Sequence, residues 1–218
     1  GVGVKELMAT NPGAVKKGLA NLEKHLENIA QFGIPAVVAI NRFVNDTEQE
    51  IALIHEACEA KGAKAFMCDH WAKGGAGAID LAREVASLAD QFSGDFKPAY
   101  QLDESVEQKI NSIATKIYGA DGVDFTSKAM ADLKKINSLG LDHLPVCIAK
   151  TQKSLSDNAD LIGRPIGFRI TVREIEIAAG AGFLVPITGD MMRMPGLPNV
   201  PSAEHIDIDE NGVISGLF

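Results

Sequence analysis

Two aromatic residues, Phe43 and Trp71, follow two consecutive apolar runs of the sequence and are the first candidates for ligand chemistry. The run 34–40 is typical of a strand buried on both faces of a parallel sheet, and 64–68 predicts a second strand. Ligands of open parallel sheets bind beyond the carboxyl ends of the strands, so two rings at that edge could hold a flat heterocycle. The competing interpretation is that Phe43 belongs to the core and that Trp71, the single tryptophan, covers a hydrophobic edge.

The two loops that carry these rings also contain polar groups. Asn41 directly follows the first strand, and Asp69, Lys73 and Gly74 lie in the loop 69–77 after the second. Their side chains and backbone groups could surround the rim of a bound ring. Asp69 is also a candidate proton acceptor, although a solvated loop carboxylate is the commoner case.

Other motifs of the sequence resemble ligand or metal sites. Gly75-Ala76-Gly77 lacks the third glycine of a dinucleotide fingerprint, although its amides could hold an anion. The segment 207–212 imitates the first half of a calcium loop, but Phe218 stands where the bidentate glutamate belongs. Of the five histidines, which show no metal-ligand spacing, only His70 lies at the proposed site. We therefore expect no metal site in this chain.

Composition narrows the class of protein. A net charge of -8 argues against nucleic acid or an anionic membrane surface as the main partner. No apolar run approaches the roughly 20 residues that span a bilayer, so we expect a soluble, cytoplasmic protein without a membrane partner. Cys58, Cys68 and Cys147 lie in apolar contexts without a C-x-x-C pair, which predicts reduced core thiols.

The elements that would position the two rings alternate between helix and strand. Thr47 and Glu50 form a capping box that begins the helix between the first two strands. The stretch 93–102, with few periodic positions, is the expected boundary between two small domains, 1–102 and 103–218. The other expected elements are helices at 12–32, 79–92, 104–118 and 127–139, strands at 123–125, 145–149, 168–177 and 183–187, and a hairpin at 206–214. This pattern predicts an α/β fold with parallel-sheet βαβ units, whose last third is richer in β-strand and ends in a carboxyl-terminal hairpin.

Several separate stretches, in order along the chain, closely resemble the formate–tetrahydrofolate ligases, also called 10-formyltetrahydrofolate synthetases. They are Asn41-Arg42-Phe43 with Asp46-Thr47, Trp71-Ala72-Lys73-Gly74-Gly75, residues 147–157, Gly180-Ala181-Gly182-Phe183, Met194-Pro195-Gly196-Leu197-Pro198 and Gly216-Leu217-Phe218. The resemblance implies an enzyme that joins formate to tetrahydrofolate at the expense of ATP, through formyl phosphate. It further implies Mg with ATP and an activating monovalent cation.

The resemblance also implies roles for particular residues. Phe43 and Trp71 would stack on the pterin of the folate, in a pocket region that can also hold adenine, with Val44 and Met67 as apolar walls. The family commonly has proline where Val44 stands, and an acidic residue followed by proline where Asn158 and Ala159 stand. The local shapes of these two loops are therefore expected to differ from those of the family.

The sequence contains no G-x-x-x-x-G-K-[ST] phosphate loop. In the family that the sequence resembles, this loop lies in the first part of a longer polypeptide. The resemblance therefore implies that this chain is the carboxyl-terminal portion of such a ligase, without catalytic residues of its own and inactive alone. Its partners would be the missing amino-terminal portion and further copies in a homotetramer. The alternative is a non-catalytic folate- or nucleotide-binding or assembly module of the same fold.

Overall fold

The computed structural model of the chain describes all residues except 1, 4–5, 95, 190–198 and 217–218. Two of the stretches that carry the family resemblance are affected: 194–198 and the terminal Leu217 and Phe218 lie outside the described residues.

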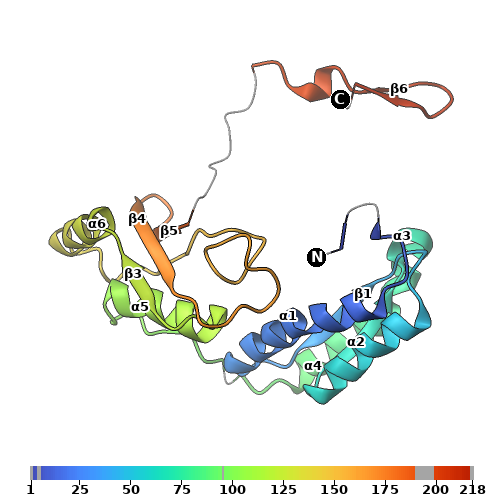
Figure 1. Ribbon diagram of the computed structural model, residues 1–218, viewed down its shortest axis with the longest axis horizontal. Helices are drawn as coiled ribbons and strands as arrows, with labels where there is room; N and C mark the ends of the chain where they lie inside the picture. The colour runs from blue at the N-terminus through green and yellow to red at the C-terminus, as the bar shows by residue number, and fades with distance from the viewer. Residues whose placement is uncertain (1, 4–5, 95, 190–198, 217–218) are drawn as a thin grey trace.

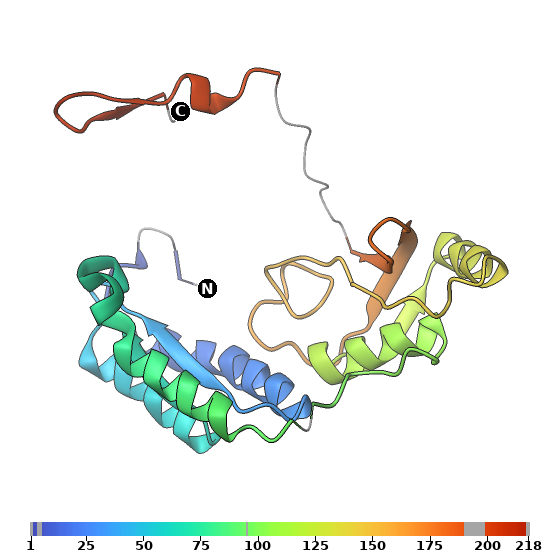
Figure 2. The same cartoon turned by 180° about the vertical axis from the view of Figure 1, so that it is seen from behind.

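The first part of the chain is a βαβ unit. Strands β1 (Val37–Asn41) and β2 (Lys64–Cys68) pair in parallel, with Asn41 opposite Cys68, as the connecting helix α2 (Glu48–Ala60) requires. Helices α1 (Pro12–Gln31) and α2 contact each other, whereas α4 (Ile79–Gln91) contacts both strands (Figures 1 and 2). The predicted parallel pairing of these strands is confirmed.

Local sequence signals begin the helices of this unit. The Asn11 side chain accepts a 3.0 Å hydrogen bond from the Ala14 amide and Pro12 takes the first helical position, as is common at helix starts. Thr47 and Glu50 form the expected capping box at α2. The Glu50 carboxylate also accepts a 2.6 Å hydrogen bond from the Asn11 backbone N–H, so the two helix starts are tied together.

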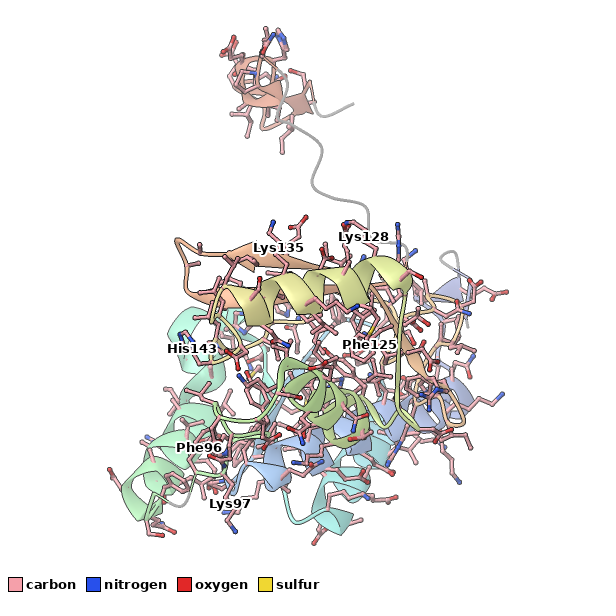
Figure 3. All side chains as sticks on the ribbon, turned by 90° about the vertical axis from the view of Figure 1, so that its left-hand side faces the viewer. Phe96, Lys97, Phe125, Lys128, Lys135 and His143 are labelled. Atoms are coloured by element: carbon pink, nitrogen blue, oxygen red, sulfur yellow. The ribbon has the colours of Figure 1, made fainter. Side chains whose placement is uncertain are left out.

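The second part of the chain builds a mixed three-stranded sheet. Strand β4 (Ile170–Ala178) lies between β3 (Val123–Phe125), which is parallel to it, and β5 (Phe183–Thr188), which is antiparallel. Helix α6 (Ser127–Ser138) packs on β4, with Lys128 and Lys135 along its length and Phe125 on the strand before it (Figure 3). The core of this part is made of buried apolar side chains: Val106, Ile110, Ala129, Leu133, Ile136, Val146, Val172, Ile175 and Leu184.

Three details differ from the sequence-based expectations. The helix expected at 104–118 is α5 (Val106–Ser112) followed by a π-helical turn, η3 (Ile113–Tyr118). The strand expected at 145–149 contributes only two isolated bridges, Val146 to Leu184 and Ala149 to Ile187. Val146 is buried and Cys147 is exposed because side chains of an extended segment alternate between faces, so the prediction of a core thiol is wrong for Cys147.

The described chain ends in the predicted hairpin. Strands β6 (Asp207–Ile208) and β7 (Ile214–Ser215) pair antiparallel, after the short turn η4 (Ser202–Glu204). Figure 1 shows this hairpin apart from the other labelled elements. Two further short turns, α3 (His70–Lys73) and η2 (Gly74–Ala78), connect β2 to α4 and lie at the site described next.

Candidate functional site

A hollow of about 470 Å³ lies at the carboxyl ends of β1 and β2. Five residues line it: Asn41, Phe43, Val44, His70 and Trp71. Phe43 and Trp71 are each 60% exposed, so the interpretation that placed Phe43 in the core is wrong. Exposed aromatic side chains around a hollow provide contact area for an apolar or flat ligand.

Backbone pairing brings the two aromatic loops together. The register that sets Asn41 opposite Cys68 continues for one step, since the Arg42 N–H donates a 3.0 Å hydrogen bond to the Cys68 carbonyl oxygen. The indole N–H of Trp71 then donates a 2.8 Å hydrogen bond to the Arg42 carbonyl oxygen. Trp71 is therefore anchored to the backbone one residue before Phe43.

A tight turn fixes the backbone at Phe43. Its N–H donates a 2.8 Å hydrogen bond to the Asp46 carboxylate, and the Asp46 N–H donates back to the Phe43 carbonyl oxygen over 3.1 Å. Thr47, the next residue, caps α2. The Phe43 ring is thus carried on a loop whose two ends are both held by hydrogen bonds.

The loop after β2 is held by Asp69 and by a close backbone approach. The Asp69 N–H donates a 3.2 Å hydrogen bond to the Gly77 carbonyl oxygen. A Cβ added at Gly77 would lie 2.6 Å from the Asp69 carboxylate and 2.7 Å from the His70 nitrogen, so only glycine fits there. Gly74 has φ of 58°, a conformation that also favours glycine.

Asp69 is engaged in an ion pair. Lys73 Nζ lies 2.6 Å from its carboxylate, and this hydrogen bond, despite some desolvation, holds the pKa of Asp69 below its usual range. A carboxylate with a lowered pKa is a weak proton acceptor. The arrangement therefore favours a structural role for Asp69 over a role as a general base.

The structure brings together only part of the expected site. Phe43, Val44, Trp71 and Asn41 line the hollow, whereas Met67, Asp69, Lys73 and Gly74 are not among its lining residues. Met67 is half-buried within β2. His70, left out of the expected clamp, does line the hollow, and its position directly before Trp71 was the signal for it.

Metal binding finds no support among the residues that the structure describes. No group of three or more His, Cys, Asp or Glu side chains is placed there to hold a metal ion. In the same part, none of the helices is long and apolar enough to cross a membrane.

Comparison with known protein families gives one match over the whole length of the chain. Residues 1–218 match the family model described as formate–tetrahydrofolate ligase. The matched region includes both aromatic loops and the whole hollow between them.

Proposed function

Since the chain belongs to the formate–tetrahydrofolate ligase family, we propose that it supplies the pterin and adenine pocket of the ATP-dependent reaction that joins formate to tetrahydrofolate. The hollow between Phe43 and Trp71 is the pocket in this proposal. One observation carries it: both aromatic side chains are largely exposed and line the same hollow at the carboxyl edge of parallel strands.

A reduced pterin has two flat faces and an edge of hydrogen-bond donors and acceptors. Phe43 and Trp71 would contact the faces, and Val44 would add apolar area. Asn41 and His70 would lie at the edge, where an amide and an imidazole can each donate or accept. Each stacked ring would contribute on the order of 1 kcal/mol beyond its area burial.

We propose that the ATP phosphates and formyl phosphate are bound by residues other than those that line the hollow. No Walker-type loop occurs in residues 1–218, and such a loop is the usual cradle for a triphosphate. The residues that we assign to the pocket bind and orient the folate, and Trp71 and Phe43 exclude water from its faces. The attack of folate N10 on formyl phosphate would take place at a centre that these residues only border.

Assembly with further polypeptide fits the surface of the chain. Ile79 and Val85 on α4 are 44% and 50% exposed, and the hairpin exposes Ile208 and Val213, each at 62%. Exposed apolar side chains in clusters mark contact surfaces, and a two-stranded hairpin is marginal alone. We propose that these surfaces contact the rest of the ligase in a cytoplasmic homotetramer, which light scattering of the ligase would test.

The test uses the single tryptophan, Trp71. Titration of the chain with tetrahydrofolate should change the Trp71 fluorescence in a saturable way, because the pterin would stack on that indole. Phe43→Ala should weaken this binding roughly tenfold if the lost contact is about 1.4 kcal/mol. Phe96→Ala, a change of another exposed phenylalanine outside the hollow, serves as the control and should leave the affinity unchanged.

Two results would count against the proposal. One is the absence of any saturable change in Trp71 fluorescence. The other is a loss of affinity in Phe96→Ala that equals the loss in Phe43→Ala. A chain that binds tetrahydrofolate but adds nothing to ligase activity when it is joined to the rest of the enzyme would favour the alternative of a binding module.

A further inference from the structure

We propose that a second hollow, lined mainly by α1, η3 and the segment 150–155, is a binding site for a small phosphate-class anion. This hollow has a volume of about 270 Å³ and shares no lining residue with the one at Phe43 and Trp71. Pockets for drug-sized ligands begin near 300 Å³, so the space suits a small ion. The residues that carry the argument are Asn21, His25, Asn28, Tyr118, Lys150 and Lys153.

The first wall is a polar face of α1. Asn21, His25 and Asn28 recur at four and three residues, so they lie on one side of the helix. The same side is fixed against η3, because Lys24 Nζ donates a 2.8 Å hydrogen bond to the Lys116 carbonyl oxygen. The side of α1 that carries these three residues therefore faces the second part of the chain.

The second wall is the end of the π-helical turn. Such turns are rare and occur frequently at functional sites. Tyr118 is its last residue and lines the hollow. Burial raises the pKa of Tyr118, so its hydroxyl stays a neutral donor.

The third wall supplies positive charge. Lys150 Nζ donates hydrogen bonds to the carbonyl oxygens of Thr151 and Ser154 and lies 5.1 Å from the centre of the Tyr118 ring. An ammonium group has three donors, so one remains for a ligand. Burial lowers the pKa of Lys150, and an anion beside it would favour the charged form.

The charge of the lining is opposite to that of the chain. The sequence has 29 acidic and 21 basic residues, yet this lining includes Lys150, Lys153 and His25 and no Asp or Glu. Basic groups in a polar concavity attract anions, and the carboxylate that acts on Lys150, that of Asp157, lies outside the lining.

Asn28 favours an anion that can donate a hydrogen bond over one that can only accept. Its side chain is buried, and its Oδ1 is an acceptor without a hydrogen-bond partner in the described structure. A buried polar atom without a partner is unfavourable, so a rotation of the Asn28 side chain that presents Oδ1 to a ligand donor in the hollow would satisfy it. Hydrogen phosphate offers an O–H donor for Asn28 and acceptor oxygens for Lys150 and Tyr118, whereas a carboxylate offers acceptors only.

The test is a calorimetric titration of the 218-residue chain with inorganic phosphate at constant ionic strength. We expect saturable binding that is at least tenfold weaker in Asn28→Leu, with a melting temperature equal to or above that of the unchanged chain, because this change removes the orphaned acceptor. Tyr118→Phe should also weaken binding. Lys134→Met, which removes a lysine from the exposed surface of α6, is the matched control and should bind phosphate as the unchanged chain does.

Parallel titrations with acetate and with sulfate separate the candidate anions. Weaker binding of both than of phosphate supports the role of the phosphate O–H at Asn28. The proposal would be overturned by the absence of saturable phosphate binding, by acetate binding as tightly as phosphate, or by Asn28→Leu binding phosphate normally. None of these outcomes depends on folate binding at Phe43 and Trp71, so the two proposals can fail separately.

Discussion

The indole N–H of Trp71 donates a 2.8 Å hydrogen bond to the carbonyl oxygen of Arg42, which joins the loop after β2 to the loop after β1. Because Arg42 directly precedes Phe43, this bond fixes one aromatic ring relative to the backbone that carries the other. The two rings therefore depend on each other for position although they lie 28 residues apart in sequence.

Two substitutions of Trp71 distinguish the contribution of its ring to folate binding from that of its hydrogen bond to Arg42. Trp71→Phe keeps an aromatic face but loses the bond to Arg42, so the KM for tetrahydrofolate in an active ligase containing this chain should rise a few-fold, as expected for about 1 kcal/mol. Trp71→Ala loses both and should raise it roughly tenfold or more. ATP-dependent formation of formyl phosphate should change little, because the lost contacts grip the pterin. A rise in the folate KM that is matched by an equal fall in the rate of formyl phosphate formation would contradict this assignment.

Gly77 and Gly75 provide a matched pair for the loop after β2. Gly77→Ala places a Cβ 2.7 Å from the Asp69 backbone, whereas a Cβ at Gly75 meets nothing within 4 Å. We expect Gly77→Ala to displace the loop and to weaken tetrahydrofolate binding several-fold, with a loss of about 1–3 kcal/mol in unfolding free energy from overpacking. Gly75→Ala should match the unchanged chain in both fluorescence titration and urea denaturation. Similar behaviour of the two variants would show that the close approach at Gly77 does not hold the loop.

The three cysteines should differ in reactivity. Cys58 and Cys68 are buried and Cys147 is exposed, and burial raises the pKa of the Cys58 thiol. Since the thiolate is the reactive species, a thiol reagent at neutral pH should modify Cys147 first. One rapid equivalent that disappears in Cys147→Ser is the expected result, with the other two thiols reacting only after denaturant is added. Rapid reaction of all three thiols in the folded chain would contradict the burial of Cys58 and Cys68.

Catalysis by the chain alone offers another prediction. Without a Walker-type loop in residues 1–218, the purified chain should show no formate-dependent ATP turnover. A coupled ADP assay, run beside a complete ligase of the family, measures this directly. Robust turnover by the 218-residue chain would require phosphate-binding residues that we have not identified.

The helices and strands near the site follow from local signals. The caps at Asn11 and Thr47 and the apolar runs of β1 and β2 are short-range patterns, and a connecting helix implies parallel pairing. The rings at Phe43 and Trp71 were accordingly predicted at one edge. The division at 93–102 into two domains stays a prediction.

Other features depend on contacts that no local pattern encodes. The bond from Trp71 to Arg42 and the close approach at Gly77 arise only when two loops meet in space. The π-helical turn 113–118 has the same apolar spacing as an ordinary helix end, so periodicity did not distinguish it. Met67 was expected as a wall of the hollow, but it lies one residue before the end of β2 and is not among the lining residues, whereas Asn41, the last residue of β1, is.

A network around Glu27 joins α1 to later parts of the chain and leads to a prediction about acid. Arg164 donates to both oxygens of the Glu27 carboxylate, over 3.0 and 2.6 Å, and Lys61 donates to one of them over 2.9 Å. The hydrogen bonds from Arg164 and then Lys61 lower the pKa of Glu27 to about 2, from an ordinary value of 4.5. The ionised carboxylate is therefore favoured in the folded state relative to the unfolded chain.

The sign of the pH dependence follows from this lowered pKa. The stabilisation is fully present above pH 4.5 and is lost as the pH falls toward 2, because the unfolded chain takes up the proton first. The three side chains are about a third exposed, so solvent limits the effect, and Glu27→Gln should cost about 1 kcal/mol at pH 7. Urea denaturation at pH 7, 4 and 3 should show the difference between Glu27→Gln and the unchanged chain shrinking as the pH falls. Glu56→Gln, an exposed change on α2, is the control, and a Glu27→Gln difference that stays constant from pH 7 to 3 would show that the Arg164 pairing does not stabilise the fold.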